Sequence, residues 1–239
     1  MTQDGRLTVG VIGAGPVGVA LAQALAGAGH ILTGITAASP ESLERVDAML
    51  PGLDLLTPPQ VLERSELVLL TIPDEELQKT IAGFAKANLW RPGQIVAHTS
   101  AKFDYTVFEP AAQKGAIPIA LHPAMRFTGT SIDVARLKEC FFAVAAPSIA
   151  LPIAQALVIE MGSEPIIIDS SQRAAYAEAF DVATNFSALV VNQAIGLLEE
   201  AGIENARLLI APTIRSAVER ALDDGHQPLN PNDVLREEE

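Results

Sequence analysis

Three glycines near the start of the chain have the spacing of a nucleotide-binding turn. Residues 13–18 form a G-x-G-x-x-G motif between an apolar run at 7–12 and a stretch of helical character. In this context Gly13 would make the tight turn, Gly15 would let a pyrophosphate approach the backbone, and Gly18 would let helix pack on strand. A glycine-rich turn without a ligand is the alternative. We expect a dinucleotide to be bound by Gly13, Ala14, Gly15, Pro16, Val17 and Gly18.

The residues after the second apolar run bear on the choice between NAD and NADP. NAD-binding proteins place an acid about 20 residues past the glycines to bind the ribose 2′-OH, but residues 36–39 read Thr-Ala-Ala-Ser. Without a carboxylate nothing there repels a 2′-phosphate, and Ser39 would cap a helix whose N–H groups could receive one. We expect NADP, bound in part by Thr36 and Ser39, with NAD less favoured. Alternatively Ser39 is only a cap, and Arg45 pairs with Glu41 one turn away.

Two histidines end later apolar runs. His98 opens a His-Thr-Ser sequence that ends at Ser100, and His122 opens a His-Pro pair. Ligands of open α/β sheets bind at the carboxyl ends of the strands, where Ile72 and Pro73 would also meet the cofactor. Both imidazoles are therefore expected at one cleft, moving a proton as hydride is transferred. The alternative for each histidine is a hydrogen-bonded strand end. Without a carboxylate partner they do not make a metal site.

A polar candidate also lies on a long apolar stretch near the end of the chain. Residues 171–201 predict one helix of about thirty residues, ended by Gly202. On it Asp181, Asn185 and Asn192 recur at helical spacing among apolar neighbours. Buried polar groups need hydrogen-bond partners, and a substrate would provide one for Asn185. The alternatives are a solvated stripe or a polar seam in a dimer interface.

The elements that must position these residues alternate between short apolar runs and helical stretches. Strands are expected at 7–12, 31–36, 67–72, 94–98, 117–121, 141–145 and 165–169, with a weaker one near 53–56. This pattern predicts an α/β fold, a Rossmann-type doubly wound and mostly parallel sheet in a domain of residues 1–169. A smaller all-α domain, residues 170–239, would follow. Because a long apolar helix needs a partner surface, we expect a homodimer through the C-terminal helices.

The bulk composition excludes several classes of protein. The 239 residues carry a formal net charge of -13, which disfavours nucleic acid and anionic membranes as partners. No apolar run approaches the roughly 20 residues of a membrane span, and the first residues lack the layout of a signal peptide. Cys140, the single cysteine, is expected to be a buried small hydrophobe. We expect a soluble cytoplasmic protein.

The chain resembles a known family in four features. They are the glycine fingerprint at residues 13–18, the His98-Thr-Ser sequence, the His122-Pro pair and the helix from Tyr176 to Asn185. Members of this family pair a Rossmann-like domain, akin to pyrroline-5-carboxylate reductase and 6-phosphogluconate dehydrogenase, with domain of unknown function 2520. The resemblance covers nearly the whole chain and implies an NADP-dependent oxidoreductase whose long helix forms a dimer and completes each active site. The chain departs from the family at Ala101, where glycine is usual, and at Ala177, where histidine is usual.

Two classes of function follow from these observations. The first is an NADP-dependent oxidoreductase that transfers a hydride to or from a small carbonyl, imine or hydroxy acid. His98 or His122 would move the proton, while Ser100 and Asn185 orient the substrate. The second is a non-catalytic NADP-binding sensor or assembly protein, which the alanines at positions 101 and 177 favour. A deazaflavin in place of NADP is a further alternative.

Overall fold

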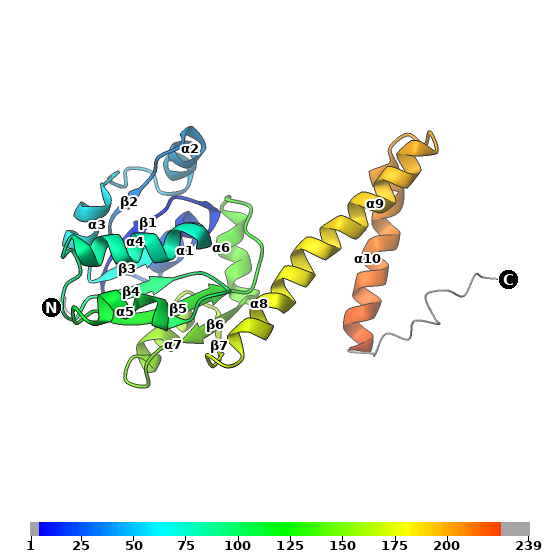
Figure 1. The fold of residues 1–239 in the computed structure, drawn as a ribbon. Helices are drawn as coiled ribbons and strands as arrows, with labels where there is room; N and C mark the ends of the chain where they lie inside the picture. The colour runs from blue at the N-terminus through cyan, green and yellow to red at the C-terminus, as the bar shows by residue number, and fades with distance from the viewer. Residues whose placement is uncertain (1–4, 226–239) are drawn as a thin grey trace. The chain divides into compact units, whose positions relative to one another are not determined.

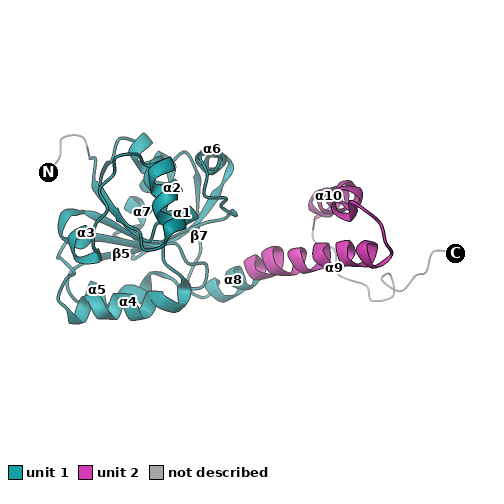
Figure 2. Cartoon of the chain, turned by 90° about the horizontal axis from the view of Figure 1, so that it is seen from above, with its two compact units in different colours: residues 1–178 teal, residues 179–239 magenta. Residues whose placement is uncertain are grey.

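The computed structural model describes residues 5–225. The chain divides into two compact units, residues 1–178 and 179–239 (Figure 2). The first unit is built on one seven-stranded sheet in the order β2-β1-β3-β4-β5-β6-β7. Its strands are β1 (Thr8–Ile12), β2 (Ile31–Thr36), β3 (Leu67–Leu70), β4 (Ile95–His98), β5 (Ile117–Pro123), β6 (Phe141–Ala145) and β7 (Glu164–Ile167). The predicted Rossmann-type, mostly parallel sheet is confirmed.

The topology of the sheet places its ligand crevice. Every neighbouring pair is parallel except β5 and β6, which are antiparallel. The weaker run near 53–56 forms only an isolated bridge between Leu55 and Ile35, beside β2. The chain winds outward in opposite directions from β1 and β3. At such a switch point the carboxyl ends of the two strands open a crevice.

Helices cover both faces of the sheet and bury a separate apolar core on each (Figure 1). One core includes residues of α1 (Pro16–Gly27), α2 (Pro40–Met49) and α7 (Leu151–Glu160). The other includes residues of α3 (Pro58–Arg64), α4 (Asp74–Lys86) and α5 (Glu109–Ala112). Because side chains alternate along a strand, Val11 enters the first core and Ile12 the second. The unit also contains three short helical turns, η1 (Tyr105–Phe108), α6 (Ile132–Arg136) and η2 (Leu137–Glu139).

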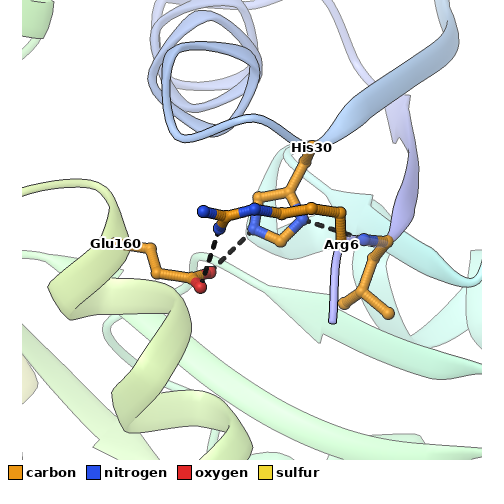
Figure 3. Close-up of polar contacts among 4 residues, drawn as sticks. Arg6, His30 and Glu160 are labelled. Carbon is orange, nitrogen blue, oxygen red and sulfur yellow. Dashed lines mark hydrogen bonds and ion pairs between the residues drawn. The ribbon is translucent and has the colours of Figure 1, made fainter. Parts of the chain in front are cut away.

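A polar clamp joins three segments that are distant in the sequence (Figure 3). The Leu7 amide donates to His30 Nδ1 over 3.1 Å, and His30 Nε2 lies 2.8 Å from Glu160 Oε2. Arg6 donates to the other carboxylate oxygen of Glu160 over 2.9 Å. Since Nδ1 accepts, Nε2 carries the proton and donates to Glu160. The clamp fixes the entry of β1, the turn before β2 and the end of α7.

Residues 173–200 form the predicted long helix, 28 residues in length. It comprises α8 (Arg173–Asp181), the π-helical turn η3 (Val182–Phe186) and α9 (Ser187–Glu200). In the second unit α9 packs on α10 (Ala206–Asp224). The division between the compact units falls within α8, and the predicted domain boundary after residue 169 stays a prediction. Among residues 5–225, no helix is long and apolar enough to cross a membrane.

Candidate cofactor and substrate site

The glycine fingerprint lies at the switch point, and side chains from three other segments hold it in shape. The Gly13 amide donates to Thr36 Oγ1 over 2.9 Å, and the Gly13 carbonyl accepts from Thr71 Oγ1 over 2.6 Å. Arg45 Nη1, from α2, donates to the carbonyl of Ala14 over 2.9 Å. The turn is therefore preformed, and it carries a guanidinium beside it.

The space around the three glycines separates what the fold needs from what a ligand needs. A Cβ on Gly13 would lie 2.6 Å from the Thr71 carbonyl oxygen, and one on Gly18 would lie 2.1 Å from the Gly13 carbonyl oxygen. The fold requires both glycines. Gly15 has an ordinary φ of -70°, and its Cβ would approach nothing closer than 3.9 Å. Packing therefore does not explain Gly15, whereas a phosphate seated on the start of α1 would fill the space that a Cβ there would take.

The predicted cofactor residues outside the fingerprint are placed at the same end of the sheet. Ser39 caps α2 by accepting from the Ser42 amide over 3.2 Å, and Thr36 is the residue that supports Gly13. Ile72 lines an apolar cavity of about 580 Å³ together with residues of α4, and Pro73 is the N-cap of that helix. Arg45 reaches the fingerprint, so its positive charge is available to a phosphate there.

His98 and His122 lie on the same side of the sheet. Residue 98 pairs with Ala120 across the parallel strands β4 and β5, and His122 is two residues beyond Ala120. Since paired residues and residues two apart point to the same face, both imidazoles face the side covered by α4 and α5. Burial lowers the pKa of both rings, and the positive charge of Arg173 lowers each of them further.

Both ring nitrogens of His98 are bonded to backbone groups of the loop that follows β4. The side chain is fully buried, Nδ1 accepts from the Ser100 amide at 3.2 Å, and Nε2 lies 3.0 Å from the Asp104 carbonyl oxygen. Burial lowers the pKa of His98 to about 4, so the ring is neutral near pH 7 with its proton on Nε2. Ser100 Oγ in turn accepts from the amides of Lys102 and Phe103. This matches the strand-end alternative for His98.

His122 has a different partner. Its Nδ1 lies 2.7 Å from the hydroxyl of Tyr176, and the two rings meet edge to face with centroids 5.5 Å apart. Burial, aided by the charge of Arg173, lowers the pKa of His122 to about 4. Burial also raises the pKa of Tyr176 to about 12. Near neutral pH the pair is a neutral imidazole hydrogen-bonded to a protonated phenol.

Arg173 and Tyr176 were not among the predicted site residues, although the family resemblance included Tyr176. Both lie on the first turn of α8, and Ala177, the position of the usual family histidine, is one turn after Arg173 on the same side of the helix. Nothing in the sequence marks Arg173, because its environment exists only after folding. Asn185 belongs to the second unit, where it lies exposed in η3, and its role stays a prediction.

Comparisons with known proteins bear on this fold. A Rossmann-like domain matches residues 1–123, and domain of unknown function DUF2520 matches residues 140–230. No curated protein sequence matches the chain.

Solved structures share the fold at low sequence identity. A Bacteroides fragilis protein described as a "putative NADP oxidoreductase" has 18% identity and a TM-score of 0.74, covering 97% of this chain and 85% of its own. The imine reductase of a Pseudomonas species has 16% identity and a TM-score of 0.67, with 92% and 76% covered. The 3-hydroxyisobutyrate dehydrogenase of Mycobacterium tuberculosis has 18% identity and a TM-score of 0.60, with 87% and 70% covered.

At these identities the likeness shows a shared NAD(P)-binding fold. The chain therefore belongs to the Rossmann-like family, with the domain of unknown function 2520 as its C-terminal part.

Proposed function

We propose that the protein is an NADP-dependent oxidoreductase that transfers a hydride to or from a small carbonyl, imine or hydroxy acid. The observation that carries the proposal is the open space at Gly15. The fold does not require a glycine at this position, whereas a bound pyrophosphate would. The His122–Tyr176 pair supports the proposal. His122 lies near the carboxyl end of β5, at the same edge of the sheet as the fingerprint.

The residues present fit such a cofactor. Gly15 and the free amides at the start of α1 would bind the pyrophosphate, and the apolar cavity at Ile72 would take the flat face of the adenine. Arg45 and the capped start of α2 at Ser39 would bind a 2′-phosphate. When bound, the nicotinamide supplies or accepts the hydride.

In this proposal His122 and Tyr176 move the proton. For reduction, the hydroxyl of Tyr176 would donate its proton to the substrate oxygen or nitrogen, and solvent would return a proton to the phenolate through His122. For oxidation the same transfers would run in reverse, and His122 would pass the proton to solvent. His98 and Ser100 position the loop after β4 instead of touching the substrate. Asn185 stays the candidate for orienting the substrate.

The experiment compares melting of the full-length protein with NADP(H) and NAD(H). A ligand at about 100 times its dissociation constant stabilises the folded state by about 2.7 kcal/mol, so the phosphorylated form should give the larger rise. The free energy of unfolding of Gly15→Ala should lie within about 0.5 kcal/mol of the parent value. Its affinity for NADP(H) should fall at least about tenfold, which is 1.4 kcal/mol. Gly18→Ala is the matched control, and should lose about 1–3 kcal/mol of stability through overpacking.

Three results would count against this proposal. Equal or larger shifts with NAD(H) would remove the choice of NADP. Unchanged cofactor affinity in Gly15→Ala would remove the site. Tight binding of NADP(H) without turnover of any carbonyl, imine or hydroxy acid would favour the sensor.

A further inference from the structure

Arg173 carries a buried positive charge that the described residues do not satisfy. The residue is 3% exposed, and Nε and both Nη nitrogens are buried without a hydrogen-bond partner in the described part of the chain. A guanidinium has five N–H donors in a planar fork. Leaving a buried charge unpaired is costly, and buried cations in proteins are normally paired.

The neighbours of Arg173 account for one face of its guanidinium and no more. Its Cζ lies 5.6 Å from the centre of the Tyr176 ring, a cation–π contact that leaves the in-plane N–H groups unused. Asp104 acts on Arg173 through its charge, but no hydrogen bond joins the two, and the Asp104 carboxylate accepts from Thr106 and from Ser170. Among residues 5–225, folding therefore leaves the fork of Arg173 without a hydrogen-bond acceptor.

A cavity of about 400 Å³ lies against this residue. Its walls include Arg173 and the polar side chains Gln78, Lys102, Asp104, Thr106 and Ser170. The cavity lies beside the loop that follows His98, and the guanidinium of Arg173 lies over the ring of Tyr176, the proposed proton donor. Because Cζ of Arg173 lies 5.6 Å from the centre of the Tyr176 ring, an acceptor bound to Arg173 would lie near that ring.

We propose that Arg173 binds the carboxylate of the substrate, so that the enzyme acts on small oxo, imino or hydroxy acids in preference to uncharged carbonyl compounds. A carboxylate matches the fork with two parallel hydrogen bonds. The inference rests on the proposed function and names the substrate class of that same site.

Binding of an anion also has a consequence for His122. In the free protein the positive charge of Arg173 adds to burial in lowering the pKa of that imidazole. A carboxylate on Arg173 offsets the charge, so the pKa of His122 should rise when the acid binds. Recognition of the acid would thereby prepare the imidazole to hold the proton that moves through Tyr176.

The test uses the full-length protein with and without NADP(H). The probes are pyruvate and oxamate, their uncharged counterparts pyruvamide and oxamide, and inorganic phosphate. We expect the two acids to bind and the amides not to bind. Arg173→Met should weaken the binding of both acids by about 100-fold, Arg173→Lys should lie between, and the control Arg64→Met, an exposed cation on α3, should bind like the parent. Without ligand, Arg173→Met should melt at the same or a higher temperature, because a buried unpaired charge has been removed.

The outcomes separate this inference from the proposed function. The inference would be overturned if Arg173→Met bound the acids like the parent, or if it were strongly destabilised without ligand. A parent protein that binds neither acid would also overturn it. Tighter binding of phosphate than of the acids would overturn the carboxylate class. Arg173-dependent binding of oxamate without any response to NADP(H) would leave the anion site standing and remove the oxidoreductase. NMR of the His122 ring gives a second readout, a rise in its pKa on binding oxamate that Arg173→Met abolishes.

Discussion

The two histidines at the carboxyl ends of β4 and β5 differ in what their nitrogens do. Both ring nitrogens of His98 bond to backbone groups of the following loop. His122 offers Nδ1 to a phenol. We therefore expect the two histidines to serve different purposes, loop positioning for His98 and proton movement for His122.

Replacing each histidine with alanine should separate these purposes. His98→Ala leaves the Asp104 carbonyl and the Ser100 amide without their partner, so we expect a loss of about 1–3 kcal/mol of stability. His122→Ala should reduce turnover of an accepted substrate by roughly 10²- to 10⁴-fold, with a smaller change in melting temperature. Denaturation and steady-state kinetics on the two variants measure both effects, and a reversed pattern would exchange the two roles.

The burial of His98 makes the free energy of unfolding depend on pH. The pKa of His98 falls from 6.5 to about 4 on folding, so the unfolded chain binds more protons between these values. The stability that the protein gains from a neutral, buried His98 is fully present above about pH 6.5, and it is lost as the pH falls toward 4. His98→Ala should flatten this part of the pH–stability curve, and an unchanged slope would contradict the shift.

At the residue level, the sequence predicted what depends on local context. The fingerprint glycines and the Ser39 cap follow from spacing and neighbours, and the strand ends placed His98 and His122 on adjacent strands. Arg173 and Asp104 could not be found in this way. Their properties come from tertiary burial and from hydrogen bonds between segments far apart in the chain.

At the scale of elements, apolar runs predicted strands and helices well because each has its own period. The short runs near 53–56 carried too little apolar length, and only Leu55 pairs. The turn η3 was not predictable, since a π turn changes the phase of a helix without changing its composition. The face that 3.6-residue spacing assigns to Asp181, Asn185 and Asn192 is therefore interrupted at residues 182–186.

The clamp around His30 gives a prediction about elements. His30→Ala removes the acceptor of the Leu7 amide, and we expect a loss of about 1–3 kcal/mol in denaturant unfolding. Glu160→Gln keeps an oxygen for the Nε2 proton and should cost less. Arg6→Met should change stability by at most about 1 kcal/mol, because its ion pair is partly exposed. A His30→Ala variant as stable as the parent would show that β1 does not need the clamp.

At the scale of the whole molecule, the second unit exposes large apolar side chains along both of its helices. They include Phe186, Leu189, Val190, Leu197, Leu208 and Leu209. Exposed apolar patches of this kind mark interaction surfaces, and a second copy of the chain is the occupant that the family resemblance implies.

Assembly can be measured directly. We expect light scattering at micromolar concentration to give about twice the 25.2 kDa mass of the chain, because burying these side chains favours association. Leu189→Glu should shift the protein toward the monomer, whereas Arg64→Met, on the first unit, should not. A parent protein that is monomeric at that concentration would remove the dimer.

The fingerprint turn has a kinetic consequence. Thr36, Thr71 and Arg45 fix its backbone before any ligand arrives, so little conformational freedom remains to be lost on binding. Association of a dinucleotide should then be governed by encounter, with no slow rearrangement after contact. Stopped-flow traces would follow one exponential whose rate rises linearly with ligand concentration, and differences between NADP and NAD would lie in how long each stays bound.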